Sequence, residues 1–585
     1  MSVDRFALPP SDVDPLALLT VEAGTVLDAI TGLSGTDPVV RPSDRADAQV
    51  NGALALAREV GRQPREIAEE LAASEVLAGI CSTAEVAGPG FVNVTFESAM
   101  LDSLLAAMAA DERLGLPRTT APLTVVIDYS APNVAKEMHV GHLRSTVIGD
   151  ALVRMYEGVG HRVVRENHIG DWGRPFGMLI EHLLDLGADV AADGLGQGDL
   201  DGFYKAANAK FDQSEEFQER SRERVVLLQS GDPETARLWD RLVAMSTEYF
   251  NTVYEKLGVL LVDDDLAGES RYQPLMPGTL DRLETSGLMT ESDGARVVFP
   301  PGFTNRDGDP LPLIVQARTG GFNYATSDLS CVIDRVERLG ADLMLYVVGA
   351  PQQQHLEMVF AVARMAGWMP DGVEAQHVAF GNVLGDDRKM LRSRSGASVK
   401  LVDLLDEAVD RAGVAVAEKN PELSAEERAE VARMIGIGAV KYADLSTDRV
   451  RDYVFDWDRM LAFDGNTAPY LQYAHARIRS IFRRAGDVGA AMTVPAVVEP
   501  AERALALLLL AHGTVVADSL SSNSPHRLCT HLFELAQAFT TFYEQCPVLK
   551  AADEVRGARL ALCDLTARTL AHGLGLLGID APERM

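Results

Sequence analysis

The feature that most constrains the fold is a strand-like run that a short loop joins to a helix. Residues 123–128 (LTVVID) form an apolar run of the length of a buried parallel strand. Residues 140–156 repeat apolar side chains every three or four positions, which is the period of a helix. A strand that leads into a helix in this way predicts a doubly wound sheet with a ligand site at the junction.

Two histidines lie at the entrance of this helix, in the segment HVGH (139–142). Backbone N–H groups at a helix entrance are unpaired, and the positive end of the helix dipole attracts phosphate. His139 and His142 are three residues apart, so both imidazoles can share one face of the first turn and donate to phosphate oxygens. Gly141 leaves no side chain between them, so a flat base can approach the backbone. The segment predicts ATP binding without a Walker loop.

The flanks of HVGH carry a family signature. HVGH resembles the first signature of class I aminoacyl-tRNA synthetases, HIGH, and SAPNVAKEMHVGHLRST is similar to the form found in arginyl-tRNA synthetases. The resemblance continues, in order, through ENHIGDWG, YATSD, YVVGAPQQQH, RSRSG, NTAPYLQYAHARIRSI and the terminal APERM. It implies ATP-dependent ligation of L-arginine to tRNA(Arg) through an arginyl-adenylate, with release of AMP and pyrophosphate.

The sequence predicts a multidomain α/β protein. Residues 1–117 mix helical patterns with a strand-like segment at 86–96, which indicates a separate α+β module; the resemblance implies that it contacts the tRNA elbow. From 118 to 400, four strand-like runs alternate with helical spans, as in a Rossmann-like doubly wound parallel sheet: 123–128, 161–167, 341–350 and 374–383. A polar section at about 190–300 indicates a mostly helical insertion into this catalytic domain.

Residues 401–585 have an almost purely helical pattern. We divide them into a helical connector, 401–455, and an all-α bundle, 456–585. The resemblance implies that the bundle binds the anticodon.

The expected chemistry needs no enzyme base, because an amino-acid carboxylate is already ionised near pH 7. Catalysis then rests on positioning and on compensating the charge of the phosphates, with His139 and His142 as donors and Mg²⁺ as the expected helper.

The second class I signature, KMSKS, is degenerate here (DDRKMLRSRSG), and the resemblance places Lys389, Arg392 and Ser393 beside ATP. In synthetases of this group that lack the loop lysine, a lysine just before HIGH is thought to replace it. Lys136 occupies that position. We assign the pyrophosphate side to Lys136 and, as the alternative, to Arg392.

Selection of arginine requires acidic and planar partners, because a guanidinium carries five N–H donors. Tyr324 and Asp328 are four residues apart in a segment that can be helical, so they could face one ligand. The resemblance makes both, together with Glu269, binders of the guanidinium. It makes Asn133 and Gln352 binders of the α-carboxylate and α-amino groups.

The resemblance places four residues in the anticodon-binding region: Tyr470, Tyr473, Arg477 and Met585. Aromatic rings there could stack on unpaired bases. The net charge of −31 argues against a generally basic nucleic-acid surface, although RIRSIFRR (477–484) could form a local patch. We therefore expect tRNA binding to be locally guided and strongly dependent on salt.

The five cysteines are dispersed and never form CxxC, so we expect neither disulfides nor zinc. The N-terminus lacks the pattern of a signal peptide, and LALLLLAHG (505–513) is expected to belong to a buried helix. We expect a cytoplasmic monomer without membrane association.

Two alternatives to a housekeeping ligase stay open at this point. Arg174 and Arg392 depart from the usual family pattern, which leaves room for a specialised duplicate that supplies arginyl-tRNA to biosynthesis or resists an inhibitor. The other alternative is a non-catalytic, tRNA-binding regulatory protein.

Overall fold

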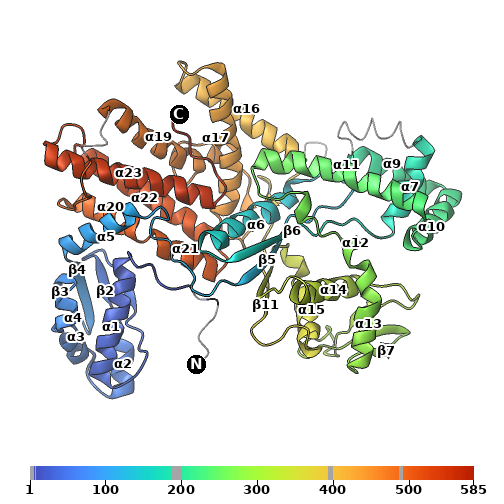
Figure 1. Ribbon diagram of the computed structural model, residues 1–585, viewed down its shortest axis with the longest axis horizontal. Helices are drawn as coiled ribbons and strands as arrows, with labels where there is room; N and C mark the ends of the chain where they lie inside the picture. The colour runs from blue at the N-terminus through green and yellow to red at the C-terminus, as the bar shows by residue number, and fades with distance from the viewer. Residues whose placement is uncertain (1–5, 7, 188–199, 393–398, 487–491) are drawn as a thin grey trace. The chain divides into compact units, whose positions relative to one another are not determined.

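The computed structural model describes residues 6, 8–187, 200–392, 399–486 and 492–585. Its residues form two compact units (Figure 1). The first contains Met1–Thr120, Val416–Gly438 and Leu461–Met585, and the second contains Ala121–Ala415 and Ala439–Met460.

The second unit is built on a parallel sheet with the strand order β11-β10-β5-β6. The strands are β5 (Thr124–Asp128), β6 (Arg162–Glu166), β10 (Leu343–Tyr346) and β11 (Glu374–His377). Each lies within one of the four predicted runs, and the doubly wound fold is confirmed. The order changes direction at β5, and such a reversal is where open α/β sheets bind ligands at the carboxyl ends of their strands.

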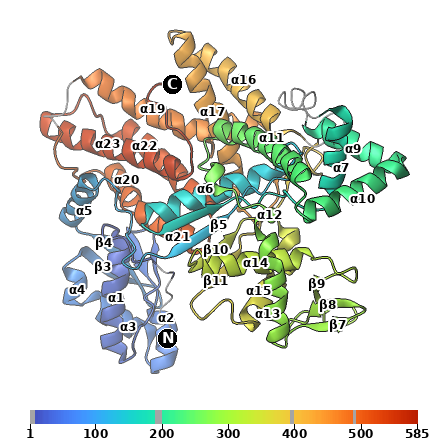
Figure 2. The same ribbon diagram turned by 45° about the vertical axis from the view of Figure 1, so that its right-hand side comes forward.

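Helices cover this sheet. α14 (Tyr324–Glu337) and α15 (Gln353–Met365) share a hydrophobic core with β5 and β10, in which Val126 and Met344 meet Leu329 and Val359. Both helices lie beside the β11 edge in Figures 1 and 2. α6 (Val140–Gly158) packs against β5 and β6, and α7 (Pro175–Leu186) packs against the insertion.

A buried arginine ties α14 to the sheet. The Arg335 guanidinium lies 2.6 Å from Asp128 at the end of β5 and 2.6 Å from Glu166 at the end of β6. It also lies over the ring of Tyr346, at the end of β10. Because removal of one partner would leave a buried charge uncompensated, these contacts hold α14 at the carboxyl edge of the sheet.

The insertion is helical as far as α13 and then adds a small sheet. Its helices are α9 (Leu200–Gln213), α10 (Glu215–Gln229), α11 (Pro233–Leu257), α12 (Glu269–Tyr272) and α13 (Met276–Thr285). The antiparallel sheet β7-β8-β9, which the sequence pattern did not indicate, follows with strands Thr290–Ser292, Ala295–Val298 and Leu313–Gln316.

The first unit contains the N-terminal α+β module and most of the C-terminal helices. The module has an antiparallel sheet of order β1-β2-β4-β3, formed by Val40–Pro42, Ala48–Val50, Phe91–Phe96 and Cys81–Ala87. Its helices are α1 (Pro15–Thr31), α2 (Ala53–Val60), α3 (Pro64–Ala72), α4 (Glu75–Ala78) and α5 (Ser98–Ala110). The predicted segment 86–96 covers the last two residues of β3, the turn and all of β4.

The C-terminal region is helical, as predicted. α16 (Leu401–Lys419) and α17 (Ala425–Leu445) precede α18 (Trp457–Met460), and β12 (Val383–Leu384) pairs with β13 (Tyr453–Val454). The bundle consists of α19 (Ala468–Ala485), α20 (Pro500–Leu510), α21 (His512–Ser521), α22 (His526–Gln545) and α23 (Asp553–Leu576). α19, α22 and α23 lie side by side (Figure 1).

The apolar segment around 505–513 spans the junction of α20 and α21. The stretch Pro500–Ser521 is long enough to cross a membrane, and an 18-residue window of it has a mean hydropathy of 1.6. Half of this window is buried, and α20 packs against α5, α22 and α23. These contacts are those of a helix in a protein core.

Candidate active site

The predicted histidine pair lies at the start of α6, after the loop that follows β5. His139 is the N-cap of α6, and its Nδ1 accepts from the Gly141 N–H at 3.0 Å. His142 Nδ1 accepts in turn from the His139 N–H at 3.1 Å. The two ring centroids are 4.1 Å apart, so the imidazoles share one face of the first turn as expected.

These contacts determine what each ring can donate. An Nδ1 atom that accepts a hydrogen bond places the hydrogen of a neutral imidazole on Nε2. Burial lowers the pKa of His142 to about 3 and also lowers the pKa of His139. Near pH 7 both side chains are therefore neutral and present one Nε2–H donor each.

The backbone at this helix entrance differs from the expectation of unpaired N–H groups. Besides the two N–H groups that bond to imidazoles, the Val140 N–H donates to Val399 O at 3.0 Å, and the His142 N–H donates to His139 O at 2.8 Å. The Leu401 N–H also donates to Met138 O at 2.8 Å. The chain after the degenerate second signature thus pairs with HVGH. The Val140 N–H, which an isolated helix would offer to phosphate, is therefore already bonded to Val399 O.

Gly141 is required by the ring beside it. A Cβ atom at this position would lie 2.7 Å from His139 Cε1 and 2.9 Å from its Nδ1, closer than real Cβ contacts. The glycine therefore allows the His139 ring to fold back over the helix entrance, in addition to keeping the space between the histidines open.

The cationic residues predicted to bind the ATP phosphates lie in two segments, one before α6 and one after β12. Lys136 Nζ is 4.5 Å from the ring centre of Tyr204 in α9, and its charge contributes to the lowered pKa of both histidines. Lys389 and Arg392 are exposed residues of the segment after β12. Ser393 lies outside the described residues.

Residues of α11 hold the loop that carries Lys136. The Ala135 N–H donates to Ser246 Oγ at 2.9 Å, and Ser130 Oγ lies 2.8 Å from Tyr254 Oη. Ser130, Ala131 and Ala135 all have positive φ, a conformation that non-glycine residues rarely adopt and that is often found at functional sites. The sequence patterns did not indicate this support, because it comes from a helix more than 100 residues away.

Two of the predicted arginine-binding residues lie on α14. Tyr324 and Asp328 lie on the first turns of this helix, where Tyr324 is 72% exposed. Asp328 Oδ2 is 2.5 Å from His355 Nε2 on α15, and this contact raises the pKa of His355. No sequence pattern indicated His355 as a partner of Asp328. Its position at the end of the segment YVVGAPQQQH was the one available signal.

Glu269, the first residue of α12, lies near enough to Asp328 for the two charges to interact. Burial raises the pKa of its carboxyl to about 7, and the charges of Asp171 and Asp328 add to that rise while His168 opposes it. The Glu269 N–H donates to Ile169 O at 3.1 Å. Glu269 and Asp328, the two acidic residues that the resemblance assigned to the guanidinium, thus lie near each other in the structure.

The predicted binders of the α-carboxylate and α-amino groups are both exposed. Asn133 pairs with Gly170, where an added Cβ would lie 2.3 Å from Asn133 Oδ1, so only glycine leaves room for the amide. Gln352 precedes α15 and is three residues before His355. Its N–H donates to Gly349 O at 3.1 Å.

Three family models match the chain in succession. They are the arginyl tRNA synthetase N terminal domain at 25–96, the tRNA synthetases class I (R) catalytic domain at 104–457, and the DALR anticodon binding domain at 471–585. The arginine–tRNA ligase of Thermobifida fusca is 54% identical, over 98% of this chain and 100% of its own length. That of Edwardsiella ictaluri is 47% identical over 94% of this chain and 96% of its own length.

The chain belongs to the arginyl-tRNA synthetases.

Solved structures agree with this assignment. The arginyl-tRNA synthetase of Plasmodium falciparum matches with a TM-score of 0.84 and 25% identity, over 97% of this chain and 99% of its own. That of Thermus thermophilus matches with a TM-score of 0.80 and 27% identity, over 97% and 100%. This synthetase is an ATP-dependent class I enzyme.

The predicted tRNA-binding residues of this synthetase lie on α19 and at the C-terminus. Tyr470, Tyr473 and Arg477 follow one helical row, in which Tyr473 is 43% exposed. Tyr470 packs edge-on against Phe533, and Arg477 lies over the ring of Tyr543, so both also contribute to bundle packing. Met585 is half-buried.

The predicted basic patch of this synthetase is partly occupied by its own C-terminal segment. Arg479 forms an ion pair with Glu583 at 2.8 Å, and Arg483 donates to the Glu583 carbonyl at 2.8 Å. The His475 ring also bonds to Pro582 O. These contacts hold the segment before Met585 against α19 and reduce the free positive charge there.

The cysteines of this synthetase are all buried and unpaired: Cys81, Cys331, Cys529, Cys546 and Cys563. Among the described residues, no group of three or more His, Cys, Asp or Glu side chains could hold a metal ion.

Proposed function

We propose that this synthetase ligates L-arginine to tRNA(Arg) in two steps through an arginyl-adenylate. The observation that best supports this function is the position of two neutral imidazole donors at the start of α6, in the same unit as the acidic pair Glu269 and Asp328. The donors suit ATP phosphates, and the pair suits a guanidinium.

In the first step, the arginine carboxylate attacks the α-phosphorus of ATP and expels pyrophosphate. His139 and His142 donate through Nε2–H to the phosphate oxygens. These neutral donors stabilise the charge that develops there without first having to be protonated. Lys136 compensates the leaving pyrophosphate, with Arg392 as its alternative and Lys389 and Ser393 beside ATP. Mg²⁺ would arrive on the ATP phosphates, because the described residues contain no protein cage for it.

The guanidinium is held by Asp328 and Glu269, with the exposed Tyr324 ring as the planar partner. Asp328 is already paired with His355, so arginine competes with or joins this imidazole at one carboxylate. Asn133 and Gln352 then hold the α-carboxylate and α-amino groups, which orients the nucleophile toward the phosphates.

In the second step, the terminal ribose 2′-hydroxyl of tRNA attacks the adenylate carbonyl, as class I membership implies, and releases AMP. We assign the anticodon contacts to Tyr470, Tyr473, Arg477 and Met585, of which Tyr473 offers the most accessible ring for base stacking. We further propose that the enzyme acts as a cytoplasmic monomer.

Pyrophosphate exchange tests this function. We expect exchange that depends on arginine among the twenty amino acids, measured with and without tRNA(Arg). The folded His139→Ala/His142→Ala variant is the control and should lose most of the exchange, because preorganised donors contribute about 3 kcal/mol each to a transition state. Exchange with another amino acid, or normal exchange in the variant, would contradict the proposal.

A further inference from the structure

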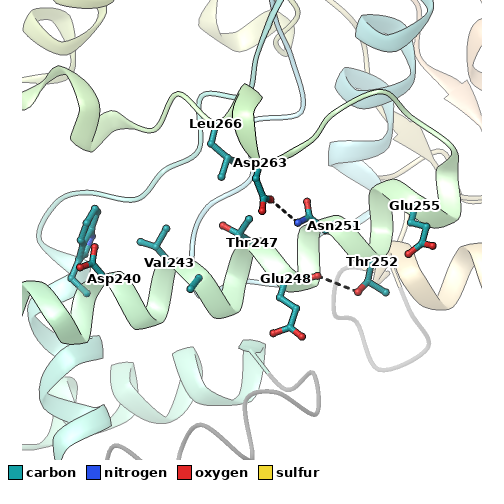
Figure 3. Close-up of a pocket in the computed structure, with 11 residues that line it drawn as sticks. Asp240, Val243, Thr247, Glu248, Asn251, Thr252, Glu255, Asp263 and Leu266 are labelled. Atoms are coloured by element: carbon teal, nitrogen blue, oxygen red, sulfur yellow. Dashed lines mark hydrogen bonds between the residues drawn. The ribbon is translucent and has the colours of Figure 1, made fainter.

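A groove between α11 and the segment 263–266 shares no residue with those proposed to bind ATP, arginine or tRNA. It has a volume of about 640 Å³ and is lined by a stripe of α11 on one side and by Asp263 and Leu266 on the other. A neighbouring hollow shares Asn251, Glu255 and Asp263 with it and extends it to Asp264. Figure 3 shows the stripe and the facing segment.

The floor and the rim of this groove differ in character. The row Trp239, Val243, Thr247 and Asn251 follows the i, i+4 spacing of one helix face and lies next to Leu266. The rim is acidic, and none of the described lining residues is a lysine, arginine or histidine; its carboxylates are Asp240, Glu248, Glu255, Asp263 and Asp264. The groove therefore attracts cations and repels phosphate.

Thr247 points to a ligand independently of the charges. Its residue is 8% exposed, and its Oγ1 is buried without a hydrogen-bond partner among the described residues. In Figure 3 its side chain rises from α11 between Val243 and Asn251 toward Asp263. A buried hydroxyl without a partner costs free energy, which a ligand N–H in the groove would recover.

The carboxylates are spaced along the helix rather than gathered at one point. Asp240 and Glu248 are eight residues apart, or about 12 Å along the axis at 1.5 Å per residue, and Glu255 is about 10 Å further. Among the described residues no carboxylate cluster could hold a metal ion. Such spacing suits an extended organic cation with several charges.

We propose that this groove binds a linear aliphatic polyamine. Its methylene chain covers Val243, Ala244 and Leu266, and its ammonium groups pair with the carboxylates of both rims. One ammonium donates to Thr247 Oγ1, and the half-buried Trp239 ring offers its face to another. Trp239 is held in place because its Nε1–H donates to Asp171 O at 2.7 Å.

Calorimetric titration of the full-length enzyme with spermidine tests the proposal. We expect saturable binding of one molecule in 0.15 M salt, where diffuse attraction is screened beyond about 8 Å. Butylamine, with one charge, should bind at least about tenfold more weakly, because each exposed ion pair contributes up to about 1 kcal/mol. Lack of saturable binding, or equally tight binding of Mg²⁺, would overturn the proposal.

Two variants and a matched control locate the site. Asp240→Asn/Glu248→Gln should weaken spermidine binding about tenfold. Glu223→Gln/Glu234→Gln removes the same charge from exposed positions outside the groove and should leave binding unchanged.

Thr247→Val keeps the shape of the side chain and should weaken binding severalfold through the lost hydroxyl. All variants should retain aminoacylation, which reports an intact fold. Equal weakening in the control and groove variants would assign the effect to general surface charge. Binding of a lysine tetrapeptide without binding of spermidine would replace the polyamine with a basic protein segment. Either result contradicts the proposal.

Discussion

The pKa of Glu269 makes the use of arginine depend on pH. Burial raises the pKa of this carboxyl to about 7, and only the ionised form can pair with a guanidinium. The ionised fraction is about one tenth at pH 6, one half at pH 7 and nine tenths at pH 8. Because kcat/KM reports ionisations of the free enzyme, kcat/KM for arginine should rise about tenfold from pH 6 to pH 8.

Glu269→Gln provides the decisive comparison. The amide cannot ionise, so the variant should lose this pH dependence. Its kcat/KM at pH 8 should also be lower than that of the wild type, by a factor that corresponds to about 1.5–3 kcal/mol of lost transition-state stabilisation, as expected for a lost hydrogen bond to a charged group. The assay is aminoacylation with arginine varied at saturating ATP and tRNA, from pH 6 to pH 8. A rise with the same midpoint in Glu269→Gln would refute the reasoning and point to His355, which titrates against Asp328.

The same carboxyl affects stability with a definite sign. Its folded-state pKa is raised from 4.5 to about 7, so the folded state binds this proton more tightly than the unfolded state. The associated stabilisation is at most about 3 kcal/mol. It is fully present below pH 4.5 and is lost as the pH rises toward 7. Because Gln resembles the neutral carboxyl, denaturant titrations of the wild type and of Glu269→Gln should agree below pH 4.5 and diverge as the pH rises, with the wild type becoming the less stable protein.

Further predictions concern the remaining contacts of the site. Asp328→Asn should lower kcat/KM for arginine about tenfold or more, leave the KM for ATP unchanged, and lower the pKa of His355 in an NMR titration, since the pair that raises it is lost; an unchanged His355 titration would argue against this contact. Gly141→Ala should slow adenylate formation about tenfold in a folded protein, because the new Cβ displaces the adjacent imidazole; a normal rate would show that the ring orientation is unimportant. Lys136→Ala should lower kcat more than Arg392→Ala does, and the reverse order in single-turnover measurements would return the pyrophosphate role to the loop.

Much of the site could be predicted because its signals are local in the chain. The apolar run at 123–128 and the helical period after it specify a strand and a helix whatever else is present, and the loop between them must then lie at the carboxyl edge of the sheet. Tyr324 and Asp328 are one helical turn apart, so their common face also follows from local spacing. The family resemblance added Glu269, which no local pattern distinguishes from a surface glutamate.

Other properties depend on distant parts of the chain, and only the tertiary structure decided them. The pairing of Asp328 with His355 and the raised pKa of Glu269 arise because three separate segments converge and exclude water there. The N–H of Val140 is occupied by Val399, more than 250 residues away, so the helix entrance differs from the one that a local reading predicts. Sequence periodicity determines which elements form, whereas burial and partner choice depend on how these elements pack, and packing sets the protonation and hydrogen bonding on which the chemistry depends.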